Sequence, residues 1–174
     1  DGKVSASGVY NISKSKKKAG KFYFLFNDIS LKEFTDSIPG TEGYIGGRFN
    51  GLVSLVQKER RTNMLDGLFN FWTVGSKKEK RAVGRAFLER LGAKERFLLG
   101  SSKNYDKGLL HGYINKGVIT FNELEISNSI LGFKDLNIKV HNKRNSISVA
   151  HLLSVIRETA RRASAGSLDF HFQN

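Results

Sequence analysis

The feature that most limits the fold of this chain is an unbroken apolar run, Phe22–Phe26. Neighbouring side chains of a β-strand point to opposite faces, so this run presents apolar side chains on both of its faces. The segment Leu68–Trp72 has the same property, with Phe69 and Phe71 on one face and Leu68 and Trp72 on the other. Strands of this kind need cover on both faces, from protein or from a ligand.

Glycine and proline usage favours a sheet. The 174 residues include 18 glycines and a single proline, Pro39. Glycine suits bulges, tight turns and close backbone approach, and the lack of proline argues against proline-rich linkers. Strands are expected at residues 1–12, 21–27, 43–57, 66–74, 108–116, 118–126, 130–133, 136–141 and 168–172, with tight turns at Lys116-Gly117 and near Asn128.

Two capping boxes mark expected helix starts. Ser30 with Glu33 predicts a short helix that ends before Pro39, and Ser76 with Glu79 predicts a second helix that ends near Gly92. A third helix is expected from Ser148 to about Ala163, where apolar residues recur at helical spacing. The predicted fold class is α+β: a curved, mostly antiparallel meander with two or three amphipathic helices packed on it.

The whole chain, 1–174, is expected to form one β-rich domain. It divides into N-terminal strands with a short helix (1–57), a strand-helix unit (66–92) and a meander with a long helix and final strand (108–174). Because the chain opens at Asp1 and its only methionine is Met64, we expect it to be part of a longer protein.

The charge favours anionic partners. Lysine and arginine number 29 against 16 acidic residues, which gives a formal net charge of +13. The residues expected to contact anions are Lys16, Lys17, Lys18, Arg81 and Arg85. A nucleic-acid-binding module is one interpretation, although no RNP1-like or zinc-finger pattern is present. Anionic lipid is the other.

Catalysis is not expected. The four histidines show no metal-binding spacing, and no GxSxG motif occurs. The absence of cysteine excludes disulfides, cysteine-ligated zinc, iron-sulfur clusters and thiol catalysis. We expect no metal site, no cofactor and no enzymatic activity.

The doubly apolar strands allow two interpretations. They could be covered on both faces by protein, as in an ordinary layered core. Alternatively, the face without helices could contact acyl chains, with basic residues meeting anionic head groups at its rim. In that case the lipid-contacting side chains would be Phe22, Phe24, Phe26, Phe69 and Phe71.

Several segments resemble the C-terminal region of AsmA-like proteins of the Gram-negative envelope. These segments are Asp66–Trp72, Ala86–Gly92, Gly108–Ile126 and Leu136–Val140, within a similarity that covers roughly residues 42–156. The resemblance implies a periplasmic domain of a protein anchored in the inner membrane. It further implies an elongated β groove with an apolar lining, for phospholipid transport or outer-membrane assembly, and it brings no catalytic residues with it.

Overall fold

The computed structural model describes residues 2–11, 19–38, 40–58, 64–90, 102–130, 133–141 and 146–166. Most of them form one antiparallel sheet of eight strands. Its strands are β1 (Lys3–Tyr10), β2 (Gly20–Ser30), β4 (Arg48–Gln57), β5 (Leu65–Val74), β8 (Lys107–Asn115), β9 (Val118–Ile130), β10 (Phe133–His141) and β11 (Ser146–Ser148). They neighbour in the order β1-β2-β4-β5-β8-β9-β10, with β11 beside β9. The sheet is not closed, and the prediction of a mostly antiparallel sheet is confirmed.

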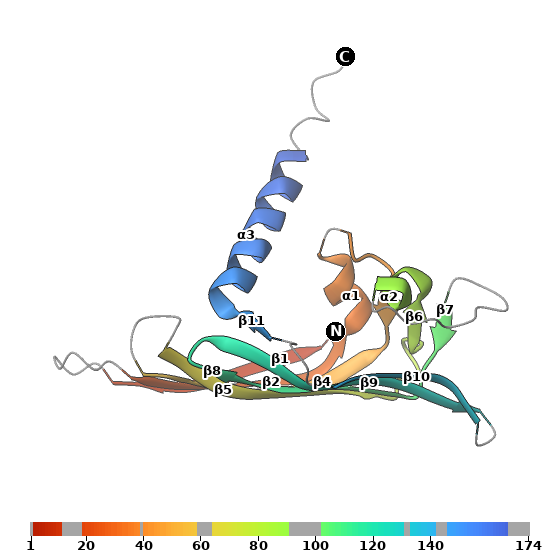
Figure 1. Cartoon of the computed structure of the whole chain (residues 1–174), viewed down its shortest axis with the longest axis horizontal. Coiled ribbons are helices and arrows are strands. Elements are labelled where there is room, and N and C mark those ends of the chain that lie inside the picture. The colour runs from red at the N-terminus through yellow and green to blue at the C-terminus, as the bar shows by residue number, and fades with distance from the viewer. Residues whose placement is uncertain are drawn as a thin grey trace, which may run out of the picture.

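A smaller layer covers part of one face of this sheet. It contains α1 (Leu31–Asp36), α2 (Arg85–Arg90) and a three-stranded sheet of β3 (Ile45–Gly46), β6 (Ala82–Gly84) and β7 (Ser102–Asn104). Figure 1 shows these elements on the same side of the large sheet, whose other side no described element covers. We call the side beneath α1 and α2 the inner face and the opposite side the outer face.

The buried core lies between this layer and the C-terminal strands. Its side chains come from β6, α2 and the β7–β8 connection on one side and from β9 and β10 on the other. They are Val83, Leu88, Tyr105, Ile126, Leu136 and Ile138. The outer face has no such cover: Tyr23 and Leu25 of β2 are 46% and 54% exposed. Within the described part of the chain, protein therefore covers only one face of β2.

The first predicted helix start is confirmed. Ser30 is the N-cap of α1, and its Oγ accepts a hydrogen bond from the backbone N–H of Glu33 at 3.1 Å. This bond satisfies one of the N–H groups that a helix start leaves without a partner.

The second predicted helix start is wrong. Residues 76–79 are not helical, Ala82–Gly84 form β6, and α2 begins only at Arg85. Ser76 Oγ accepts a hydrogen bond from the N–H of Lys78 at 3.1 Å. The Glu79 carboxylate accepts the N–H of Gly47 at 2.9 Å, so long-range partners replace the local capping box.

In the C-terminal half, one of the two expected turns forms and the other does not. The turn at Lys116-Gly117 forms, and both residues have positive φ (48° and 74°), as a two-residue hairpin turn requires. The turn expected near Asn128 is wrong, because β9 continues through Asn128 to Ile130. The strand expected at 168–172 lies outside the described residues.

The third predicted helix is α3 (Val149–Gly166). It continues from β11, and its first N–H, that of Val149, donates to the carbonyl oxygen of Gly117 at 2.8 Å. Figure 1 shows α3 projecting away from the large sheet instead of lying along it. Leu153, one of the apolar residues of α3, is 40% exposed.

Glycines on the inner face make room for phenylalanine rings on neighbouring strands. Gly112 lies opposite Phe69, and Gly51 lies opposite Phe71. A Cβ placed on Gly51 would overlap the Phe71 ring, and one on Gly112 would overlap both the Phe69 ring and a backbone carbonyl oxygen. These rings therefore lie over the backbone of the next strand, an arrangement known to stabilise glycine within sheets.

We expect Gly112→Ala to lower the free energy of unfolding by about 1–3 kcal/mol, because its Cβ would displace Phe69 and press on the backbone of β9. Gly75→Ala is the matched control, since a Cβ there meets nothing within 4 Å. Urea denaturation followed by circular dichroism measures both changes. Equal stability of the two variants would contradict the proposed packing.

Candidate apolar binding pocket

A cavity of about 380 Å³ lies between the inner face of the large sheet and the layer of α1, β3 and α2. The sheet contributes residues from five strands, and the layer contributes Leu31, Phe34, Ile45 and Phe87. The sheet residues are Phe26, Phe49, Phe71, Trp72, Thr73, Gly108, Leu109, Leu110, Leu124, Glu125 and Ile126. This volume and lining are typical of small-ligand sites.

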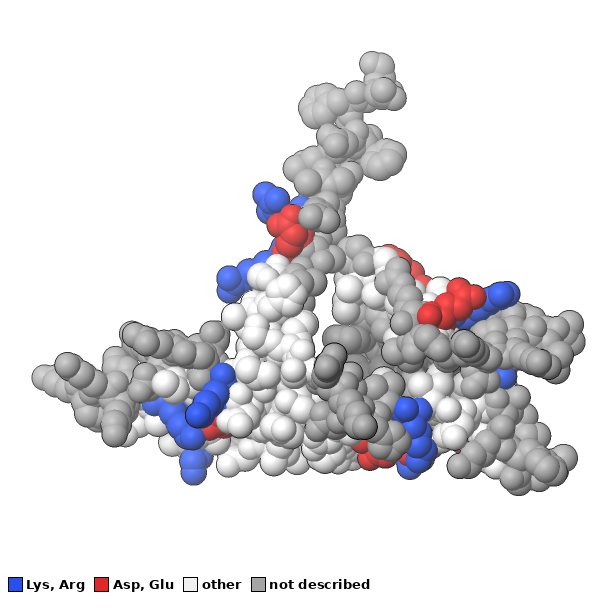
Figure 2. All heavy atoms as spheres, in the orientation of Figure 1, with Lys and Arg blue, Asp and Glu red and all other residues white. Residues whose placement is uncertain are grey.

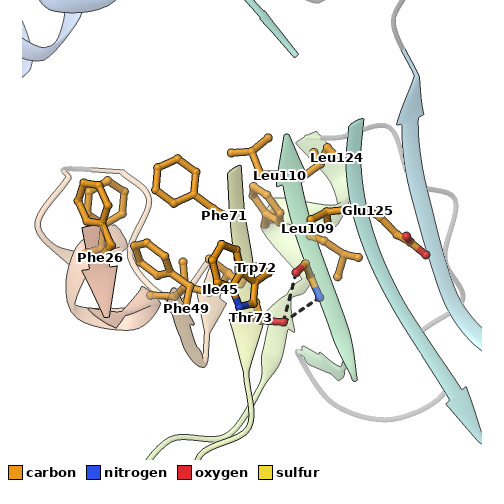
Figure 3. A pocket seen from close by; sticks show the side chains of 15 residues that line it. Phe26, Ile45, Phe49, Phe71, Trp72, Thr73, Leu109, Leu110, Leu124 and Glu125 are labelled. Carbon is orange, nitrogen blue, oxygen red and sulfur yellow. Dashed lines mark hydrogen bonds between the residues drawn. The ribbon is translucent and has the colours of Figure 1, made fainter. Parts of the chain in front are cut away.

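Three of the lining phenylalanines belong to the large sheet and lie close together. The ring centroid of Phe71 lies 5.5 Å from that of Phe26 and 5.6 Å from that of Phe49. Both pairs meet edge to face, a favourable arrangement for aromatic rings. Figure 3 shows Leu110 and Leu124 continuing the lining on the neighbouring strands.

The polar groups around the cavity are already satisfied or point away from it. Thr73 Oγ1 accepts the N–H of Gly108 at 2.8 Å, as a dashed line in Figure 3 indicates. The Glu125 carboxylate points away from the phenylalanines and lies 2.6 Å from Lys107 Nζ and 3.3 Å from Lys139 Nζ. The hydrogen bond from Lys107 lowers the pKa of Glu125, which keeps this side chain ionised. The cavity thus offers an apolar surface.

A polar cluster around the buried Arg48 holds the covering layer against the sheet. Arg48 of β4 has a side chain only 5% exposed, and its Nε lies 2.7 Å from Asp28 Oδ1. Its guanidinium also donates to the backbone carbonyl oxygen of Asp28 and lies 3.8 Å from Glu79 Oε2. Asp28 has a positive φ of 55° in the irregular part of β2, and its N–H donates to Asn50 Oδ1 at 2.8 Å.

Glu79 connects this cluster to the covering layer. Its Oε1 accepts the N–H of Gly47 at 2.9 Å and that of Lys32 at 3.3 Å. Lys32 belongs to α1, and Gly47 joins β3 to β4. One carboxylate therefore fixes the start of α1 and the end of β3, the two elements that supply Leu31, Phe34 and Ile45 to the cavity.

Tyr105 also contacts the junction between β3 and β4. Its side chain is buried, and its hydroxyl donates to the carbonyl oxygen of Gly46 at 2.8 Å. Burial raises the pKa of Tyr105, so the hydroxyl stays protonated and remains a donor. Gly47 has a φ of 117°, and a Cβ there would press against the Tyr105 hydroxyl and Arg81. This turn therefore requires glycine.

The five phenylalanines expected to contact lipid lie on one face, but this is the face that carries α1 and α2, and the expectation that they lie on the face without helices is wrong. Phe22, Phe24 and Phe26 alternate along β2, and the cross-strand register puts them on the inner face with Phe69 and Phe71. Phe26 and Phe71 line the cavity. The other three lie farther along the same face, where Phe69 is 6.2 Å from Phe71 between ring centroids.

The residues expected to contact anions are not brought together in the described structure. Lys16, Lys17 and Lys18 lie outside the described residues. Arg81 donates to the carbonyl oxygen of Asp106, and Arg85 Nε lies 2.8 Å from Glu89 Oε1. On the face shown in Figure 2, the described basic side chains lie in separate groups and not in one patch.

Several residues of the pocket lining were not predicted from the sequence. Phe49 alternates with Gly51, Val53 and Leu55 in a strand that was expected, so its face could have been inferred from period-two spacing. Phe34 and Phe87 lie on the apolar sides of helices, but their place over the sheet depends on contacts between distant segments.

Neither a metal site nor a membrane-spanning helix is found in the described part of the chain. Among those residues, no group of three or more histidine, aspartate or glutamate side chains could hold a metal ion. None of the helices in the described ranges combines the length and apolar character needed to cross a membrane.

Comparison with known proteins finds no match to a protein family, a curated protein or a solved structure.

We expect Glu79→Ala to loosen the covering layer, because two backbone N–H groups and a buried guanidinium lose an acceptor. The expected destabilisation is about 1–3 kcal/mol, and amide exchange at Gly47 and α1 should accelerate at least about tenfold. Glu79→Gln keeps one oxygen acceptor, so its stability and amide exchange rates should lie between those of Glu79→Ala and the natural protein.

Glu89→Ala serves as the control for Glu79→Ala, since the Arg85–Glu89 ion pair is exposed on both sides and should contribute less than about 1 kcal/mol. Hydrogen-exchange mass spectrometry reports on both variants. Unchanged exchange in α1 after Glu79→Ala would show that the carboxylate does not hold this layer.

Proposed function

We propose that this chain is a non-enzymatic lipid-contacting domain of an AsmA-like envelope protein, located in the periplasm and acting in phospholipid transport or outer-membrane assembly. The observation that carries the proposal is the apolar cavity of about 380 Å³ on the inner face. Its lining is aromatic and aliphatic, and the nearby polar groups already have partners. Such a surface suits a hydrocarbon chain better than a polar substrate.

The surroundings of the cavity support the same function. Phe22, Phe24 and Phe69 extend the apolar inner face beyond it. Figure 2 shows a hollow between α3 and the layer of α1 and α2. On this proposal the sheet is a curved meander whose helices turn apolar sides toward a groove, and an acyl chain lies along the phenylalanines. The lipid is anionic or zwitterionic phospholipid, and the net charge of +13 favours anionic head groups.

The alternative function, nucleic-acid binding, depends on the net charge alone. It predicts tight oligonucleotide binding that weakens steeply with salt and that Lys16/Lys17/Lys18→Glu abolishes. The cavity gives the lipid proposal a physical site, and the charge is compatible with both.

We expect Phe34→Asp to reduce phospholipid binding about tenfold, because it places a charge at the open side of the cavity. Phe34 is 55% exposed, so the substitution is compatible with folding. The matched control is Leu25→Asp, at an equally exposed site on the outer face, and it should change binding less than about twofold.

Each protein is incubated with phosphatidylglycerol vesicles, separated by gel filtration and extracted, and mass spectrometry then counts phospholipid molecules per chain. The natural protein should retain about one phospholipid, in line with one cavity. Recovery of the natural protein without lipid would refute the proposed function, as would equal losses in the two variants.

A further inference from the structure

Strand β1 forms a bare edge of the large sheet. It is the terminal strand in the sheet order, and no segment of the described ranges lies beyond it. All eight of its residues are exposed. It pairs with β2 through eight consecutive residues without a register shift, so the edge is regular along its whole length.

The backbone groups that face this edge can be assigned from one hydrogen bond. Just beyond the strand, the N–H of Asn11 donates to the carbonyl oxygen of Ala19 at 2.9 Å, toward the chain of β2. In an antiparallel pair, successive residues direct their N–H and C=O groups alternately toward and away from the partner strand. The residues that direct these groups to the open edge are therefore Val4, Ala6, Gly8 and Tyr10.

The opposite edge is protected, whereas β1 is not. Strand β10 has a register shift between Lys134 and Leu136, and it also carries Lys139. Bulges and lysines are common devices against unwanted pairing at sheet edges. Strand β1 has no bulge and no proline, and Lys3 is its only charged residue. A long regular edge with so little charge is suited to pairing with another strand.

We propose that β1 pairs antiparallel with β1 of a second copy of this chain, with Ser7 opposite Ser7. Two requirements restrict the register: inner-face residues must oppose inner-face residues, and the outward-facing backbone groups must meet. Pairing centred on Ser7 meets both, because it places Val4 opposite Tyr10 and Ala6 opposite Gly8. It provides about eight backbone hydrogen bonds between the copies.

The sequence of β1 favours a second copy as the occupant. Centring on Ser7 brings the apolar side chains of Val4 and Tyr10 together on the inner face, and it leaves Lys3 opposite Asn11, with no like charges opposed. The competing register, centred on Ala6, would place Val4 opposite Gly8 and lose this contact. The pairing is isologous, so it closes as a dimer and does not propagate into fibres.

Cysteine cross-linking tests the register, because the natural chain has no cysteine. In the proposed pairing Ser7 forms a non-hydrogen-bonded pair with its copy, at about 4.5 Å between Cα atoms, within disulfide range. The two copies of Ser5 would be about 13 Å apart, beyond that range. Mild oxidation should therefore convert Ser7→Cys to a covalent dimer at least tenfold faster than Ser5→Cys.

Sedimentation velocity over a concentration series tests the dimer itself. The natural chain should dimerise, and Ser7→Lys should weaken dimerisation by roughly five- to tenfold, since it places two lysines opposite each other. Ser5→Lys, which would face Val9, should weaken it less. A natural chain that stays monomeric at all concentrations would overturn the proposal. Faster cross-linking through Ser5 than Ser7 would also overturn it, as would a dimer that Ser7→Lys leaves intact.

Discussion

The packing of phenylalanine rings over glycines on neighbouring strands is the constraint on which the rest of the structure depends. Among the described residues, no second sheet covers much of the inner face, so its apolar side chains cannot be buried in the usual layered core. Phe69 is nevertheless buried, because it lies over Gly112, and Phe71 lies over Gly51. The sheet can therefore carry a broad apolar face that remains partly open. The cavity forms where the covering layer lies over one end of this face.

The polar cluster of Asp28, Arg48 and Glu79 explains why the covering layer does not settle onto the phenylalanines and close the cavity. Removing a guanidinium from water is costly, and the cost is offset only when its partners are well placed. The Glu79 carboxylate binds backbone N–H groups of α1 and of the β3–β4 junction, which fixes both at a set height above the sheet. Apolar contacts alone are non-directional and would favour collapse of the layer onto the sheet.

Much of the sheet and the start of α1 could be predicted from the sequence, and the rest of the covering layer could not. The strands follow from period-two spacing and from turns such as Lys116-Gly117, which are local signals. The cap at Ser30 was predictable for the same reason. The similar motif at Ser76 failed because Glu79 bonds to Gly47, 32 residues away in the chain, and local sequence does not encode that competition. The five phenylalanines share one face, but this face carries α1 and α2, whereas the face without helices was expected. The residues above them come from segments that meet only in the folded chain.

The apolar face that carries the cavity extends across β2 to the open edge at β1. Phe22 and Phe24 of β2 sit beside Gly8 and Ala6 of β1, so the apolar inner face reaches the edge strand. Pairing of two copies at β1 would therefore join two inner faces. The residues at the centre of this seam, Ala6 and Gly8, are small, and Gly8 already accommodates the Phe22 ring. A hydrocarbon chain bound on one inner face could then continue onto the other without crossing a polar barrier.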